Sequence, residues 1–251
     1  MTKINAFIAP SHSLPAKETS FLMGKNFESM RHLKEMGFWS AILSLIFAIG
    51  YIIPQILSTS GILPHPHDLF WLFLPSLFLA PAFVMTVICL HYVAPASLRI
   101  WTAIAWSFAV IYCSFVTLVY FIELTVVLPA QLKGATSRID LLLFDRKTFM
   151  MAIDCLGYFF MSLSTIFAAF AFKNVKTKWL YRSLLVNGLL IPVLILAFFY
   201  PVFYYVGALW MITFPVAMIN AARLFHRLND SSQLDLKRHY QDRKNEPWVF
   251  V

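Results

Sequence analysis

Charge is scarce in this chain of 251 residues, in which Asp, Glu, Lys and Arg together make up 13%. Soluble domains contain about 25% charged residues, so half of that value is too little for a surface that faces water. Hydrophobic residues reach 60%, and the mean hydropathy is +0.72. The shortage of charge excludes an ordinary soluble domain and indicates a membrane protein.

Catalytic and metal-binding motifs are equally scarce. The three cysteines, Cys89, Cys113 and Cys155, form no CxxC pair and lie in apolar blocks, where cysteine behaves as a small hydrophobic residue. There is no phosphate-binding glycine loop, no HExxH and no nucleophile elbow. We therefore expect no cofactor, and the lack of a nucleophile or metal cluster weighs against an enzyme.

Long apolar runs are what the sequence has instead. A helix needs about 20 apolar residues to cross about 30 Å of hydrocarbon. Runs of this length predict an all-α, polytopic integral membrane protein, a bundle of six transmembrane helices at residues 38–57, 69–93, 100–128, 148–172, 179–199 and 202–224. An alternative merges the last two into one long broken segment, since "YPVFYY" alone separates them.

These runs divide the chain into three parts. Residues 38–225 form the transmembrane domain, residues 1–37 precede it, and residues 226–251 form a polar, basic tail. Before the first run, Phe27, Met30, Leu33 and Met36 recur every three residues with basic residues between them. This spacing predicts an amphipathic helix at the membrane interface.

The basic residues predict an orientation. Sixteen of the 20 Lys and Arg residues fall in the two terminal segments and in the second and fourth connections between runs. Since lysine and arginine are enriched in cytoplasmic loops, both termini are expected in the cytoplasm, with the inner (plasma) membrane of a bacterium as the location. Contact with anionic lipid headgroups accounts for the net charge of +8, so no nucleic-acid partner is expected.

Two acidic residues lie within the predicted spans, Glu123 in the third and Asp154 in the fourth, and no Lys or Arg shares the interior with them. An ionised carboxylate in hydrocarbon costs several kcal/mol unless it is paired, hydrated or neutralised. Without a basic partner, the acids require protonation, a bound cation or a water-filled cavity.

Helical spacing predicts where the two acids face. At 1.5 Å per residue, Glu123 lies about 9 Å before Pro129, where its span ends, and Asp154 lies about 12 Å after Arg146, which precedes its span. Polar residues recur at helical spacing beside each acid, and polar side chains in membranes seek protein partners. We therefore expect an outward-leaning polar pocket that holds a proton or a cation, formed by Glu123, Asp154, Gln55, Tyr120, Tyr158, Thr117 and Ser162.

Several residues have a structural interpretation beside the functional one. Either acid can be protonated and donate one hydrogen bond that fixes a neighbouring helix. "HPHD" gives His65, His67 and Asp68 as weak metal candidates, because no further ligand is visible, and we expect no metal site. Asn187, beside Gly188 and near Pro192, either breaks the fifth helix or, as we favour, makes one interhelical hydrogen bond.

The sequence leaves three functions open. The first is a small proton- or cation-linked carrier or channel. The second is a membrane sensor or assembly subunit, without transport, that binds a lipophilic ligand or a partner. The third is a membrane-embedded enzyme acting on a lipid or quinone, with the two acids as general acid and base. Expected partners are the lipid bilayer, a small molecule, ion or lipid in the pocket, and a second copy of the chain or another membrane protein.

Overall fold

The computed structural model describes residues 16–135, 137, 139–145, 148–200 and 202–245, and these are helical without a strand. One short element, η2, is a π-helical turn, and η1, η3 and η4 are single 3-10 turns. In chain order the elements are α1 Ala16–Thr59, α2 His67–Val93, η1 Ala96–Leu98, α3 Arg99–Ile122, η2 Glu123–Val127, α4 Leu128–Leu132, η3 Asp140–Leu142, α5 Phe149–Phe170, η4 Val175–Thr177, α6 Lys178–Gly188, α7 Ile191–Leu196, α8 Val202–Gly207 and α9 Trp210–Asn245.

Five helical stretches of the described chain are long and apolar enough to cross a membrane. They span Glu28–Thr59, His67–Val93, Ala96–Leu132, Phe149–Phe170 and Tyr205–Asp230. The predictions of an all-α fold and of membrane-length helices are therefore confirmed. The sixth span and the side of the membrane on which the termini lie stay predictions.

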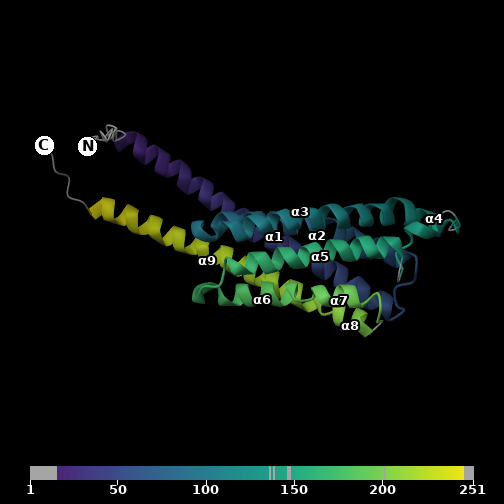
Figure 1. The fold of residues 1–251 in the computed structure, drawn as a ribbon. Helices are drawn as coiled ribbons and strands as arrows, with labels where there is room; N and C mark the ends of the chain where they lie inside the picture. The colour runs from purple at the N-terminus through teal and green to yellow at the C-terminus, as the bar shows by residue number, and fades with distance from the viewer. Residues whose placement is uncertain (1–15, 136, 138, 146–147, 201, 246–251) are drawn as a thin grey trace, which may run out of the picture.

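The fifth predicted span is interrupted, which differs from the single helix expected over residues 179–199. α6 ends at Gly188, and α7 begins at Ile191 after a turn. Glycine costs about 1 kcal/mol in a helix, and the proline at position 192 lacks the amide hydrogen that a continuous helix requires. In Figure 1, α6 and α7 follow one another along the bundle, from the end of α5 toward α8. The alternative, in which the last two predicted runs form one long broken segment, agrees with the interruption after Gly188. It does not account for α9, which is a separate long helix.

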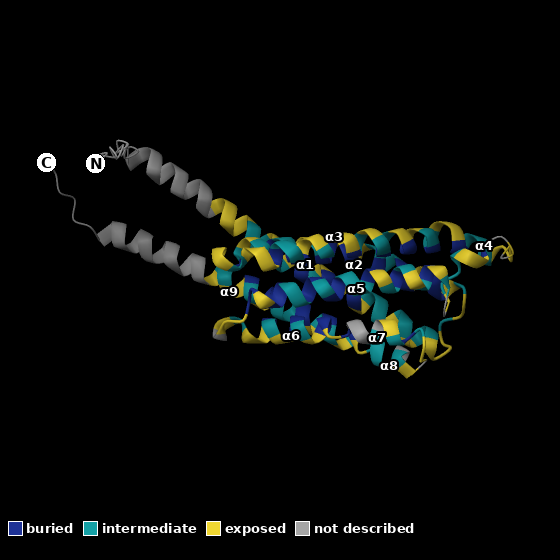
Figure 2. Cartoon of the chain, in the orientation of Figure 1, coloured by how far each residue is buried: buried dark blue, intermediate teal, exposed yellow. Residues whose placement is uncertain are grey.

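Packing brings consecutive helices side by side. α1 lies against α2 and α9, α3 against α2 and α5, and α6 against α5 and α9. Small residues such as Ala48 and Ala109 are fully buried where helices meet, which allows close approach. Large apolar side chains such as Trp39 and Ile46 point outward and are exposed. Figure 2 shows this division along the bundle, as expected for helices whose outer faces contact lipid.

The start of α1 and the end of α9 extend from the same end of the bundle (Figure 1). The opposite end carries α4, η3 and α8, and we call it the loop end. α1 enters the bundle as one unbroken helix from Ala16, so the segment expected to be an interfacial helix continues directly into the first span. α9 likewise continues through the predicted tail to Asn245, and residues 1–15 and 246–251 lie outside the described chain.

The close crossing of α5 and α6 gives a stability prediction. A Cβ atom on Gly188 would lie 2.3 Å from Cγ1 of Ile166 and 2.8 Å from the backbone oxygen of Ser162, so the helices would have to separate. We expect Gly188→Ala to lower the free energy of unfolding by about 1–3 kcal/mol, the usual effect of overpacking. The matched control is Gly207→Ala, where the nearest atom to a Cβ is 3.9 Å away. Thermal unfolding in detergent measures both, and equal midpoints would contradict the predicted crossing.

Candidate ligand-binding cavity

A cavity of about 880 Å³ lies at the loop end of the bundle. α1 and α2 form one wall, Tyr120 at the end of α3 and the face of α5 form the second, and α7, α8 and the start of α9 form the third. Ser60, Asp145 and Tyr205 line the rim and are exposed. Sites for small organic ligands usually measure about 300–1,000 Å³, and this cavity falls in that range.

Asp154 on α5 is an acidic residue of the cavity wall. Its side chain is 6% exposed, and its Oδ1 has no hydrogen-bond partner among the described residues. The hydroxyl groups of Tyr120 and Tyr158 lie 3.0 Å apart, and Tyr120 also interacts with the Asp154 carboxyl. The regular helix of α5 places Asp154, Tyr158 and Ser162 on the same wall, because residues four apart share a face.

Gln55 lies across the cavity on α1 with its hydrogen bonds largely satisfied. The hydroxyl of Tyr51 donates to Oε1 of Gln55 at 2.9 Å, and Nε2 of Gln55 donates to Oγ1 of Thr59 at 3.1 Å. All three residues line the cavity. Together they form a polar strip along the loop end of α1 that faces the wall of α5.

Glu123 does not line the cavity, in contrast to Asp154. It is fully buried at the start of the π-helical turn η2, and neither carboxyl oxygen has a hydrogen-bond partner among the described residues. Thr117 is also absent from the wall and lies 3.6 Å from Sγ of Cys113. Of the three predicted residues of the third span, Tyr120 lines the cavity, so this face reaches the wall at one position. Five of the seven predicted residues line the cavity, and Glu123 and Thr117 do not.

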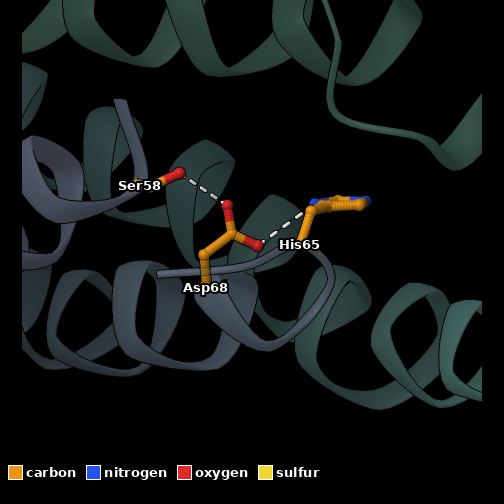
Figure 3. A network of polar contacts seen from close by, with 3 residues as sticks. All are labelled: Ser58, His65 and Asp68. Carbon is orange, nitrogen blue, oxygen red and sulfur yellow. Dashed lines mark hydrogen bonds and ion pairs between the residues drawn. The ribbon is translucent and has the colours of Figure 1, made fainter. Parts of the chain in front are cut away.

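A polar network closes the rim between α1 and α2 (Figure 3). Oγ of Ser58 donates to Oδ2 of Asp68 at 2.7 Å, and Nδ1 of His65 lies 3.1 Å from Oδ1 of Asp68. Asp68 also sits in the first turn of α2, where a negative charge is favoured by the helix dipole.

The weak metal candidates His65, His67 and Asp68 are not arranged as a set of metal ligands in the structure. The network occupies both oxygens of Asp68, and His67 is not among the residues that line the cavity. Over the part of the chain that the structure describes, no group of three or more His, Cys, Asp and Glu side chains is arranged to hold a metal ion.

Aromatic side chains form much of the wall, and sequence analysis missed most of them. Trp210 is packed edge-on by Tyr51 and Tyr158, with ring centroids 6.0 and 5.4 Å away. Phe73 and Phe144 pack against one another near Tyr120. Trp210 begins the last long helix, and tryptophan at the end of a span was the available signal.

The acidic residues of the wall differ in their surroundings. Asp68, Asp145 and Asp154 line the cavity, and no Lys or Arg is among the described residues that do so. Both oxygens of Asp68 are engaged by Ser58 and His65, whereas Oδ1 of Asp154 has no hydrogen-bond partner among the described residues. The wall is therefore suited to a neutral or positively charged ligand.

Asn187 forms a buried layer beside the cavity. Its Nδ2 donates to Oγ1 of Thr165 at 3.5 Å, and Oγ1 of Thr213 donates to its Oδ1 at 3.0 Å. The expected interhelical hydrogen bond of Asn187 is thus confirmed, and it joins α5, α6 and α9. The helix also breaks one residue later, at Gly188, so the two interpretations of this position hold together.

No protein-family model matches this chain, and neither a curated protein nor a solved structure shows a match to it.

The rim network gives a second stability prediction. Asp68→Ala removes the acceptor of Ser58 and the contact with His65 at a site that is 6% exposed. We expect a loss of about 1–3 kcal/mol in the free energy of unfolding, the usual cost of leaving buried polar groups unpaired. The control is Asp140→Ala, an exposed acid at the same end that does not line the cavity. Thermal unfolding in detergent compares the two, and an Asp68→Ala midpoint equal to that of the control would refute the role of the network.

Proposed function

We propose that this protein is an integral membrane carrier for a small solute, with six passes and with the cavity open to the outer side. Asp154 is its proton- or cation-binding group. The observation that carries the proposal is a largely buried carboxyl that lines a solute-sized cavity with no Lys or Arg among the described residues of the wall. Such a group is costly in an apolar bundle unless it is protonated or bound by a cation, and ionisable residues within membrane spans usually mark solute or ion pathways.

The interrupted helix supports a carrier. Leu190, in the turn after α6, and Val193, in α7, both line the cavity, so the break lies at the wall. Carriers commonly place interrupted helices beside their binding sites, since a break lets two halves of a pass move separately. With α6 and α7 taken together as the fifth pass, the chain crosses six times and returns to the end where it started.

The distribution of charge supports the orientation. Lys173, Lys176, Lys178 and Arg182 lie between α5 and α6 or in the first turns of α6, at the end of the bundle that carries the termini. Because basic residues mark the cytoplasmic side, the loop end and the cavity face outward.

Glu123 has a supporting role in this proposal. It is buried without a partner just beyond Tyr120, which interacts with Asp154. A carboxyl in such surroundings is most stable in its protonated form. The π-helical turn that begins at Glu123 is a frequent feature of functional sites and gives this helix a point of local rearrangement.

Transport in reconstituted liposomes tests the carrier. We expect one class within a panel of organic cations, inorganic cations, amino acids, sugars and anions to drive protein-dependent proton movement, read by a pH-sensitive dye inside the liposomes. Asp154→Asn should lower the rate of proton movement about tenfold, because the variant cannot exchange a proton or bind a cation. Glu123→Gln should keep the pH dependence of this rate, because its neutral side chain resembles the protonated acid, and Asp140→Asn should leave the rate unchanged.

Two results would overturn the carrier. One is the absence of protein-dependent proton movement for every solute in the panel. The other is a wild-type rate of proton movement in Asp154→Asn. A ligand that binds the purified protein without driving proton movement would favour the membrane sensor instead.

Thiol labelling tests the orientation and the openness of the cavity. Cys155 lines the cavity, whereas Cys89 is fully buried and Cys113 lies outside the lining. The reagent is a cationic methanethiosulfonate that reaches the outer face of the inner membrane in intact cells but does not cross that membrane. It should modify Cys155 in the wild-type protein and leave the Cys155→Ala variant unmodified. Modification of Cys155 in inverted vesicles but not in cells would reverse the proposed orientation.

A further inference from the structure

We infer that the ligand of the cavity is a lipophilic organic cation, a molecule that combines a quaternary or protonated nitrogen, or a similar delocalised positive centre, with apolar or aromatic groups. This inference deepens the proposed function and rests on the same cavity. Its basis is the size of the cavity, the sign of its charge and the aromatic side chains around Asp154.

Size separates an organic ligand from a bare ion. A cavity of about 880 Å³ is far larger than a single Na⁺ or a proton requires. Inorganic cations also need several oxygen ligands close together, about six for Na⁺-like or Ca²⁺-like coordination. Over the described residues no such group of acidic and histidine side chains is gathered.

Charge separates a cation from an anion. Asp154 lines the cavity, its Oδ1 has no hydrogen-bond partner among the described residues, and no Lys or Arg is among the described lining residues. An anion would be repelled by this carboxylate and would lose its hydration without compensation, whereas a cation gains attraction that the apolar surroundings strengthen. Asp154 lies among apolar and aromatic groups of α5 and α9, and Asp68 and Asp145 lie nearer the rim.

Aromatic rings favour a weakly hydrated cation over a strongly hydrated one. Tyr51, Tyr158 and Trp210 form one cluster, in which both tyrosine rings stand nearly perpendicular to the indole, at interplanar angles of 80° and 83°. Phe73 and Tyr120 form a second cluster beside Asp154, with ring centroids 5.5 Å apart. Aromatic faces attract positive charge, and sites for quaternary ammonium groups combine such rings with a carboxylate.

The alternatives fit this wall less well. A sugar or other polyol needs many hydrogen-bonding side chains, but Gln55 and the Tyr120–Tyr158 pair are largely engaged with their neighbours. An uncharged hydrophobic ligand would leave Oδ1 of Asp154 without a hydrogen-bond partner among the described residues. A lipophilic cation provides that partner and fills the apolar volume.

Equilibrium binding of two probes of equal shape and opposite charge tests the inference. Tetraphenylphosphonium and tetraphenylborate are added to the full-length protein in nanodiscs, with empty nanodiscs as the reference for partition into lipid. We expect the cation to bind at least about tenfold more tightly than the anion, and Asp154→Asn to weaken cation binding by about the same factor. Asp140→Asn, which removes an exposed acid that is not in the lining, should bind like the wild type.

A second pair of variants tests the aromatic contribution. Trp210→Leu should weaken tetraphenylphosphonium binding several-fold, and Trp210→Phe should recover most of the loss because it retains an aromatic face. Trp179→Leu is the control, since Trp179 is exposed and does not line the cavity. Thermal unfolding of each variant shows that it is folded, and binding by Trp210→Leu equal to wild type would exclude the aromatic cluster as part of the site.

The inference is overturned if tetraphenylborate binds as tightly as tetraphenylphosphonium, or if Asp154→Asn binds the cation like the wild type. The outcome is separable from that of the carrier. Cation binding without solute-driven proton movement leaves the ligand class standing and removes the carrier. Proton movement driven by another solute class, with no preference for the cation probe, does the reverse.

Discussion

The bundle depends on one constraint: polar groups in hydrocarbon must find their partners within the protein, because no water is present to replace them. Helices meet this constraint for the backbone. The hydroxyl groups of Ser44 and Ser76 meet it by donating to the carbonyl oxygens of residues one turn earlier. Thr86 donates to a carbonyl of its own helix and also lies 3.1 Å from the hydroxyl of Ser40, so the packing of α1 on α2 contains a hydroxyl pair. In such a bundle, a polar side chain without a partner is informative.

Two of the buried polar atoms that lack a hydrogen-bond partner among the described residues belong to the cavity wall. They are Oδ1 of Asp154 and Nε1 of Trp210, and both oxygens of Glu123, three residues after the lining residue Tyr120, also lack one. The irregular stretches of helix lie in the same region, namely the π-helical turn from Glu123 and the break after Gly188. Local departures from regular structure and from full hydrogen bonding are expected where a protein binds or moves something. The cavity therefore differs from the rest of the bundle in several independent respects, beyond its volume.

How far the sequence predicted this arrangement follows from the regularity of each helix. α5 is regular, and Asp154, Tyr158 and Ser162, which helical spacing put on one face, all line the cavity. On α3 the same spacing put Thr117, Tyr120 and Glu123 on one face, but Tyr120 alone of these three lines the cavity, because spacing does not say how far along a helix a cavity extends. The break at Gly188 had visible signals, but a run of apolar residues reads the same whether or not the helix is continuous. That Asp68 and Trp210 line the same cavity as Asp154 could not be predicted, because they come from elements distant in the chain and no spacing rule connects them.

A single carboxyl suffices to link solute binding to proton movement in the proposed carrier. A proton and an organic cation compete for Asp154, because protonation removes the negative charge that attracts the cation. Whatever favours one therefore disfavours the other by the same factor, as reciprocal linkage requires. Suppose that the carrier changes its open side only when Asp154 holds a proton or the organic cation, and never as the bare carboxylate. It then exchanges the proton for the cation without a separate coupling site. The cost of an ionised acid in the apolar bundle penalises the bare state. The burial that makes Asp154 unusual in the fold is thus also the feature that would couple the two movements.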